Sequence, residues 1–201
     1  MSSIYQRALG SDFERLHPEI QGRFGFSSKD QIASIGRGVM EEIWRGPFYT
    51  VPFLYVGAWR RIMFPEIGCQ VPFVIENCAF VDSFGRETVT WIRMFESSCR
   101  RRFDAYMIYS SKRGCIVDYL GTHQHLAVDI ELAVDAEGGL RLRSGAQRFY
   151  EGPIAFNFPL SSQALHRSVS GTTRGRAVSE SASMCATEPG DLCSATTAAF
   201  K

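Results

Sequence analysis

The sequence predicts an α+β protein in which short N-terminal helices pack on a curved antiparallel β-meander. Apolar and polar residues alternate in several segments between about residue 71 and residue 150, and short turns, most of them containing glycine, separate these segments. Alternation with a period of two is typical of strands with one buried face, and short turns join strands that run antiparallel. A partial barrel or a sandwich is the architecture expected from this pattern.

Short helices are expected at the start of the chain. Ser11 or Asp12 can cap a helical turn, and Pro18 suits the first position of the next turn, because its missing N–H would be unpaired there in any residue. A first strand is expected over residues 39–45. Residues 52–64 fit either a short helix or a strand, and we favour the helix.

The meander is expected to follow as a series of strands. The segments are 71–81, 88–95, 103–109, 115–120, 126–134 and 140–150. Segments 88–95 and 103–109 are apolar on both faces, so the middle of the sheet is expected to be covered on both sides. The N-terminal helices could cover one face, or the sheet could curl around an interior that holds a ligand. Residues 100–102, three arginines, are expected to form a solvated link between strands.

The composition changes abruptly after Leu160. Residues 161–201 are rich in Ser, Thr, Ala and Gly and show no periodicity, which is typical of disorder. We therefore expect one domain over residues 1–160 and a disordered tail over residues 161–201. A further hypothesis is that this tail is an out-of-frame translation, in which case the last strands are absent and the sheet keeps an unpaired edge.

Composition also limits the function classes. The net charge of +1 gives no overall field for nucleic acid. The sequence contains no run of about 18 apolar residues, so we expect no membrane span. The first residues do not resemble a secretory signal. The six cysteines form no C-x-x-C pair, so the expected location is cytoplasmic with reduced thiols.

Several runs resemble the family known as domain of unknown function 4166 (DUF4166). They are residues 4–10, 16–18, 23–25, 46–48, 59–65, 90–95, 121–125 and 148–153, and the resemblance covers about residues 4–160. After Leu160 the family's further strand-like sequence is missing here. The resemblance implies no activity or cofactor. Because some family members look fused to dinucleotide-binding reductase-like domains, it implies an accessory domain with a reductase-like partner.

His123 and His125 form the sharpest candidate cluster. On a strand, residues i and i+2 project to one face, so the two imidazoles could hold a metal with Asp129 or Glu131 as a third ligand. The simpler interpretation is two polar residues at the mouth of a strand. We prefer that interpretation because His-x-His is a weak signal, and we assign neither a metal nor a cofactor.

The other candidates are a carboxylate, an arginine and two tryptophans. Asp118 lies in an apolar strand, where it could act as a base or pair with an arginine such as Arg93, and pairing is favoured. Trp44 and Trp59 delimit an aromatic cluster that could line a hydrophobic pocket or form plain core.

Together these observations predict a non-catalytic module that binds a small hydrophobic, lipid-like ligand. The candidate ligand contacts are Arg93, Asp118, His123, His125, Trp44 and Trp59. Two alternatives stay open: a metal-assisted enzyme that uses His123 and His125, and a structural or interaction domain with a filled core.

Overall fold

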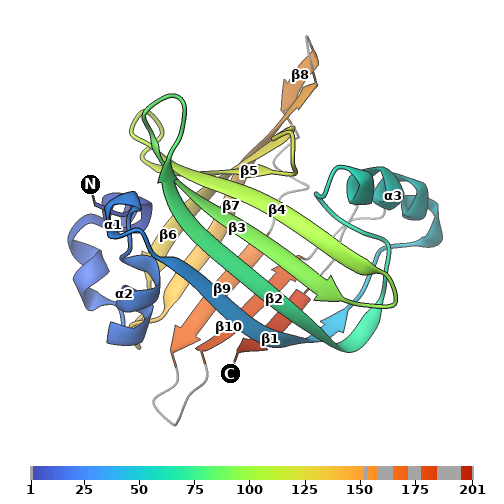
Figure 1. Cartoon of the computed structure of the whole chain (residues 1–201), viewed down its shortest axis with the longest axis horizontal. Helices are drawn as coiled ribbons and strands as arrows, with labels where there is room; N and C mark the ends of the chain where they lie inside the picture. The colour runs from blue at the N-terminus through green and yellow to red at the C-terminus, as the bar shows by residue number, and fades with distance from the viewer. Residues whose placement is uncertain (1, 152–153, 158–164, 172–177, 185–195, 201) are drawn as a thin grey trace.

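The computed structural model describes residues 2–151, 154–157, 165–171, 178–184 and 196–200. Figure 1 shows a strongly curved antiparallel sheet with α1 and α2 at one end and α3 at the other. The helical segments are α1 (Ile4–Leu9), η1 (Gly10–Arg15), α2 (Pro18–Phe24), η2 (Ser28–Asp30), η3 (Phe48–Thr50) and α3 (Val51–Trp59). None of these described helices has both the length and the hydropathy that crossing a bilayer requires.

Local sequence explains where the first helices begin. The Ser3 side chain accepts a hydrogen bond from the backbone N–H of Gln6, and the Gln6 side chain accepts one from the backbone N–H of Ser3. This reciprocal pair caps α1. Pro18 opens α2 as predicted, whereas Ser11 and Asp12, predicted as caps, lie inside the 3-10 segment η1.

The predicted meander is confirmed in the described part of the chain. Its seven strands are β1 (Ala33–Ile43), β2 (Gly68–Val81), β3 (Glu87–Glu96), β4 (Arg100–Ser110), β5 (Cys115–Leu120), β6 (Leu126–Val134) and β7 (Leu140–Glu151). Each pairs antiparallel with the next. The meander is not closed on itself, because within the described chain β1 and β7 do not pair with each other.

Several boundaries differ from the prediction, and two of these differences change how a segment is interpreted. The strand β1 begins at Ala33, six residues before the predicted start, since Gly36 and Gly38 pair with β2 instead of forming a bend. The three arginines of residues 100–102 belong to β4 and pair with the end of β3, so they are not a link between strands. The helix favoured for the ambiguous segment is confirmed as α3.

Four further strands follow the meander. They are β8 (Ile154–Asn157), β9 (Leu165–Gly171), β10 (Val178–Met184) and β11 (Thr196–Phe200). The backbone of β9 pairs with β7 and that of β11 pairs with β1. Part of the tail predicted to be disordered is therefore described as strand, because pairing needs only the backbone groups that the edges of β1 and β7 offer. The rest of the predicted tail lies outside the described residues.

The main core lies on the concave face of the sheet. It combines the apolar sides of α1, η1 and α2 with the inward residues of β1 to β7. Tyr5 from α1 is buried in this core, and its hydroxyl accepts a hydrogen bond from Trp91 Nε1 at 2.9 Å and donates one to Met107 Sδ at 3.5 Å. Phe24 from α2 packs edge-on against Tyr5 and stacks on Trp91. The helices are thus locked to the middle strands.

We predict that Tyr5→Phe lowers the free energy of unfolding by about 1–3 kcal/mol, because a buried hydrogen-bond partner of Trp91 is removed while the ring is kept. Urea unfolding followed by tryptophan fluorescence measures this. The matched control is Tyr55→Phe, whose hydroxyl is on an exposed side chain of α3. Equal stability of Tyr5→Phe and the wild type would contradict this role of the hydroxyl.

Candidate functional site

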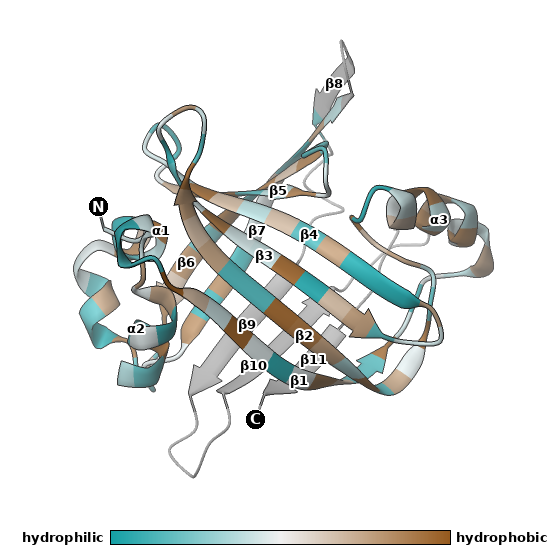
Figure 2. Cartoon of the chain, viewed as in Figure 1, coloured by the Kyte–Doolittle hydropathy of each residue, from teal (hydrophilic) through white to brown (hydrophobic). Residues whose placement is uncertain are grey.

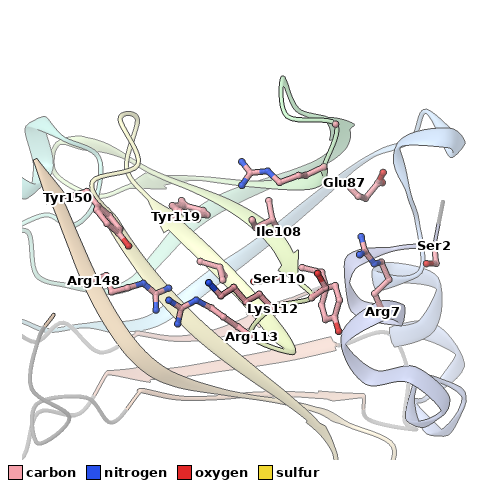
Figure 3. Close-up of a pocket in the computed structure, with 15 residues that line it drawn as sticks. Ser2, Arg7, Glu87, Ile108, Ser110, Lys112, Arg113, Tyr119, Arg148 and Tyr150 are labelled. Carbon is pink, nitrogen blue, oxygen red and sulfur yellow. The ribbon is translucent and has the colours of Figure 1, made fainter. Parts of the chain in front are cut away.

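An open pocket of about 600 Å³ lies at the end of the sheet nearest α1 (Figure 3). Its walls come from the start of the chain, the β2–β3 turn, the β4–β5 turn and the end of β7. The lining residues are Ser2, Arg7, Gly85, Arg86, Glu87, Ile108, Tyr109, Ser110, Ser111, Lys112, Arg113, Val117, Tyr119, Arg148 and Tyr150.

The floor of the pocket is apolar and belongs to the outer face of the sheet. Ile108 and Val117 pair directly across β4 and β5. With Ala127 and Tyr119 they form a second apolar cluster, separate from the main core. Their neighbours along the strands, such as Ile116, point to the concave face, because successive residues of a strand alternate in direction. This cluster explains why the central strands are apolar on both sides.

The rim of the pocket is cationic. Its five basic side chains are Arg7, Arg86, Lys112, Arg113 and Arg148. Figure 3 shows Arg7 approaching from α1 and Arg148 from β7, with Lys112 and Arg113 between them. Arg7 lies over the Tyr109 ring at 4.8 Å. With the described residues, neither Arg7 nor Lys112 forms an ion pair, so both charges are available to a ligand.

Acidic side chains hold the other three basic groups in place. Asp129 accepts hydrogen bonds from Arg148 at 2.6 and 2.9 Å and from Arg113 at 3.0 Å. Asp82 accepts one from Arg86 at 2.7 Å. Glu87 also lines the pocket and accepts a hydrogen bond from the Ser28 hydroxyl. Five basic groups therefore meet the carboxylates of Asp129, Asp82 and Glu87, which leaves an excess of positive charge at the rim.

The ionisation of Asp129 follows from this geometry. Burial raises the pKa of its carboxyl, but the hydrogen bonds and charges of Arg148 and Arg113 outweigh burial and lower the pKa overall. The hydrogen bond to Asp129 also raises the pKa of Arg148. Burial, the largest cause, raises the pKa of the nearby Cys115 thiol, which keeps that thiol protonated.

The sequence-predicted residues do not line this pocket. Arg93 is buried on the concave face, with its guanidinium over the rings of Trp91 and Phe103 at 5.1 and 5.3 Å. Asp118 is buried on the same face of β5 as the core residue Ile116. Both are therefore in the interior, where a lipid-like ligand was expected, but the described helices fill one end of that interior.

The two histidines lie together in the loop between β5 and β6. Their ring centroids are 5.5 Å apart, and His125 Nδ1 is 2.9 Å from the backbone oxygen of Tyr150, a pocket residue. Asp129, considered above as a third ligand, is bound by arginines instead. Among the described residues, no group of three or more His, Cys, Asp or Glu side chains is placed to hold a metal ion.

The predicted aromatic cluster lies elsewhere. Trp44 is half-buried just after β1, and Trp59 is exposed as the last residue of α3. Both lie on segments that do not contribute to the pocket.

Sequence reasoning missed the pocket because its basic residues come from four separate segments. The only local signal is Lys112-Arg113 in the predicted turn before residue 115, next to strands that are apolar on both faces. Arg7, Arg86 and Arg148 reach the same rim only through the antiparallel pairing.

The fold and the site define a small α+β domain with helices on the concave face of a meander and a basic-rimmed pocket on the outer face. The chain belongs to the family described as Domain of unknown function (DUF4166), whose model matches residues 16–174. The match continues past Leu160, which is the end of the range covered by the short runs that resemble the family. The family pattern therefore extends into the first part of the predicted tail.

The chain is also similar to a curated protein of Bacillus subtilis (strain 168), named "Uncharacterized protein YndH". The two are 32% identical over 148 residues, which cover 73% of this chain and 71% of the relative. No solved structure matches the chain.

We predict that Asp129→Asn lowers the free energy of unfolding by about 1–3 kcal/mol at pH 7, because two arginines lose their shared carboxylate. The lowered pKa of Asp129 in the folded state fixes the sign of the pH dependence. The stabilisation is fully present above the unfolded-state pKa of about 4, and it is lost as the pH falls through the lower folded-state pKa. The difference between Asp129→Asn and the wild type should therefore narrow in acid.

Denaturant unfolding at pH 7 and at pH 3 measures this effect. The matched control is Asp12→Asn, which removes an exposed i,i+3 pair with Arg15 and should change stability by less than about 0.5 kcal/mol. A deficit of Asp129→Asn that stays constant across this pH range would contradict the assignment.

Proposed function

We propose that this domain is a non-catalytic binding module for a small amphiphilic, lipid-like ligand with an acidic head group. The observation that carries the proposal is the combination of an apolar floor, centred on Ile108 and Val117, with a rim of five basic side chains. An apolar ligand alone would leave the charges of Arg7 and Lys112 without a counterpart, and an inorganic anion alone would not use the floor.

The dimensions support a small ligand. A pocket of about 600 Å³ lies within the range of roughly 300–1,000 Å³ that is common for small-molecule sites. In this arrangement, Arg7 and Lys112 contact the acidic head group directly. Arg113 and Arg148 remain hydrogen-bonded to Asp129, and their positive charges attract the acidic head group at longer range.

The apolar part of the ligand lies on the floor. Ile108, Val117 and the half-buried Tyr119 line this floor from β4 and β5, and Ile108 and Val117 are 6% and 3% exposed. Each ligand methylene buried against them contributes about 0.8 kcal/mol. The sequence predicts a lipid-like ligand in the interior of the sheet. The ligand proposed here is also lipid-like, but it has an acidic head group and binds on the outer face.

A first experiment is a native mass spectrum of the purified full chain, which detects a co-purified ligand. The direct test is calorimetric titration with dodecyl phosphate below its micelle concentration, compared with inorganic phosphate and with dodecyl maltoside. We expect one dodecyl phosphate per chain, bound at least about tenfold more tightly than either comparison compound, because only dodecyl phosphate uses both floor and rim.

The double variant Arg7→Gln/Lys112→Gln should weaken dodecyl phosphate binding by about tenfold. The matched control, Arg15→Gln/Lys29→Gln, removes the same two charges from exposed positions that do not line the pocket and should bind as the wild type does. Equal losses in both variants would show a non-specific charge effect and would reject the site. The absence of any dodecyl phosphate binding would reject the proposed function.

A further inference from the structure

The helix α3 is apolar on all sides and yet exposed. Its nine residues, Val51–Trp59, include no charged side chain, and only Leu54 and Gly57 are buried. Helices that are apolar all round are normally enclosed by protein or lipid. Figure 2 shows α3 with apolar colouring along its length, at the end of the sheet away from α1.

The exposed apolar surface extends beyond the helix. Phe48 in η3 is 85% exposed and Trp59 is 77% exposed. The whole set, which we call the α3 patch, consists of Phe48, Tyr49, Phe53, Tyr55, Val56, Trp59 and Ile67. Contiguous apolar patches of this kind mark sites of interaction with proteins or membranes.

The exposure is built into the fold. The backbone oxygen of Arg60 accepts a hydrogen bond from Thr122 N at 3.2 Å, and that of Arg61 accepts one from Asp104 N at 3.1 Å. Gly121, with φ of +82°, lets this contact form, because a Cβ there would lie 2.7 Å from Arg60 O. The end of α3 is therefore tied to β4 and to the β5–β6 loop, which holds the aromatic side of the helix outward.

Basic side chains surround the α3 patch. Arg60 lies over the Trp59 ring at 5.5 Å, and Arg101 is close enough to Tyr55 for the two to interact electrostatically. Arg61 and Arg102 share Asp104, and Arg101 pairs with Glu66. Arg100 begins β4 at the same end and is exposed. Glu96 lies opposite Arg100 in the β3–β4 register. These five arginines therefore outnumber the carboxylates of Glu66, Glu96 and Asp104 that lie among them.

We propose that the α3 patch docks the protein on the surface of an anionic phospholipid bilayer. Tryptophan and tyrosine favour the head-group region, where the ring is in an apolar environment and its polar atom stays hydrated. Lysine and arginine next to such residues are attracted by anionic lipids within about a Debye length. The charge argues against a second copy as the occupant, because two basic rims brought face to face would repel each other.

The test is flotation of the full chain with vesicles of phosphatidylcholine and phosphatidylglycerol (7:3), compared with vesicles of pure phosphatidylcholine. We expect binding to the anionic vesicles that weakens between 0.1 and 0.5 M NaCl. The variant Phe53→Ser/Trp59→Ser should bind these vesicles at least about tenfold more weakly, because two rings no longer enter the interface.

The matched control is Phe84→Ser, which removes a 79% exposed ring at the opposite end of the sheet and should bind as the wild type does. Absence of wild-type binding to the anionic vesicles overturns the proposal, as does full binding by Phe53→Ser/Trp59→Ser. Sedimentation velocity tests whether a second copy occupies the patch instead. If the wild type is a dimer and Phe53→Ser/Trp59→Ser is a monomer, the occupant is a second copy and the membrane proposal is overturned.

Discussion

The insertion of the Tyr5 hydroxyl between Trp91 and Met107 is the contact on which the arrangement of this domain depends. A seven-strand meander that does not close on itself leaves an apolar concave face that must be covered. The N-terminal helices cover one end of it, and the Tyr5 hydrogen bonds fix their position on the middle strands. That end of the concave face is filled by the chain itself, and the pocket lies on the outer face of the sheet.

The alternation of side chains along β4, β5 and β6 then separates two environments. Ile116 and Asp118 point into the main core, whereas Val117 and Tyr119 point to the outer face. The outer face of a small sheet is commonly polar. Here it carries an apolar cluster with arginines around it, and Asp129, placed opposite Val117 in the β5–β6 register, holds two of those arginines. The pocket is thus a direct product of strands that are apolar on both faces.

Much of the fold could be predicted from the sequence. The alternation in residues 126–134, with the turns around it, predicted β6 with both boundaries correct. The same pattern predicted β5 with both boundaries correct and β7 to within one residue. The start of β1 could not be predicted, because Gly36 and Gly38 indicate a bend locally and become strand only through pairing with β2. The family was also recognised from short runs of residues, and the matched range extends further than those runs indicated.

The candidate site was less predictable for a physical reason. His123 and His125 are neighbours in sequence, and the structure does bring them together, at the edge of the pocket. The pocket itself depends on residues as far apart as Arg7 and Arg148, which no local spacing relates. The aromatic residues from Trp44 to Trp59 were expected in a core or a pocket because they are hydrophobic. The sequence does not show whether the short helix that carries several of them packs against the sheet or extends past its end.

The direction of β4 has a consequence for how material reaches this protein. The strand runs from Arg100, beside the α3 patch, to Ser110, at the rim of the pocket, and its 11 residues span about 30 Å. That distance is several times the screening length of roughly 8 Å in physiological salt. A domain docked through α3 would hold the pocket mouth out in the aqueous phase, beyond the electric field of the lipid head groups. Its ligand would then reach the pocket by diffusion through water. The bilayer would determine where the protein is located, but it would not supply the ligand.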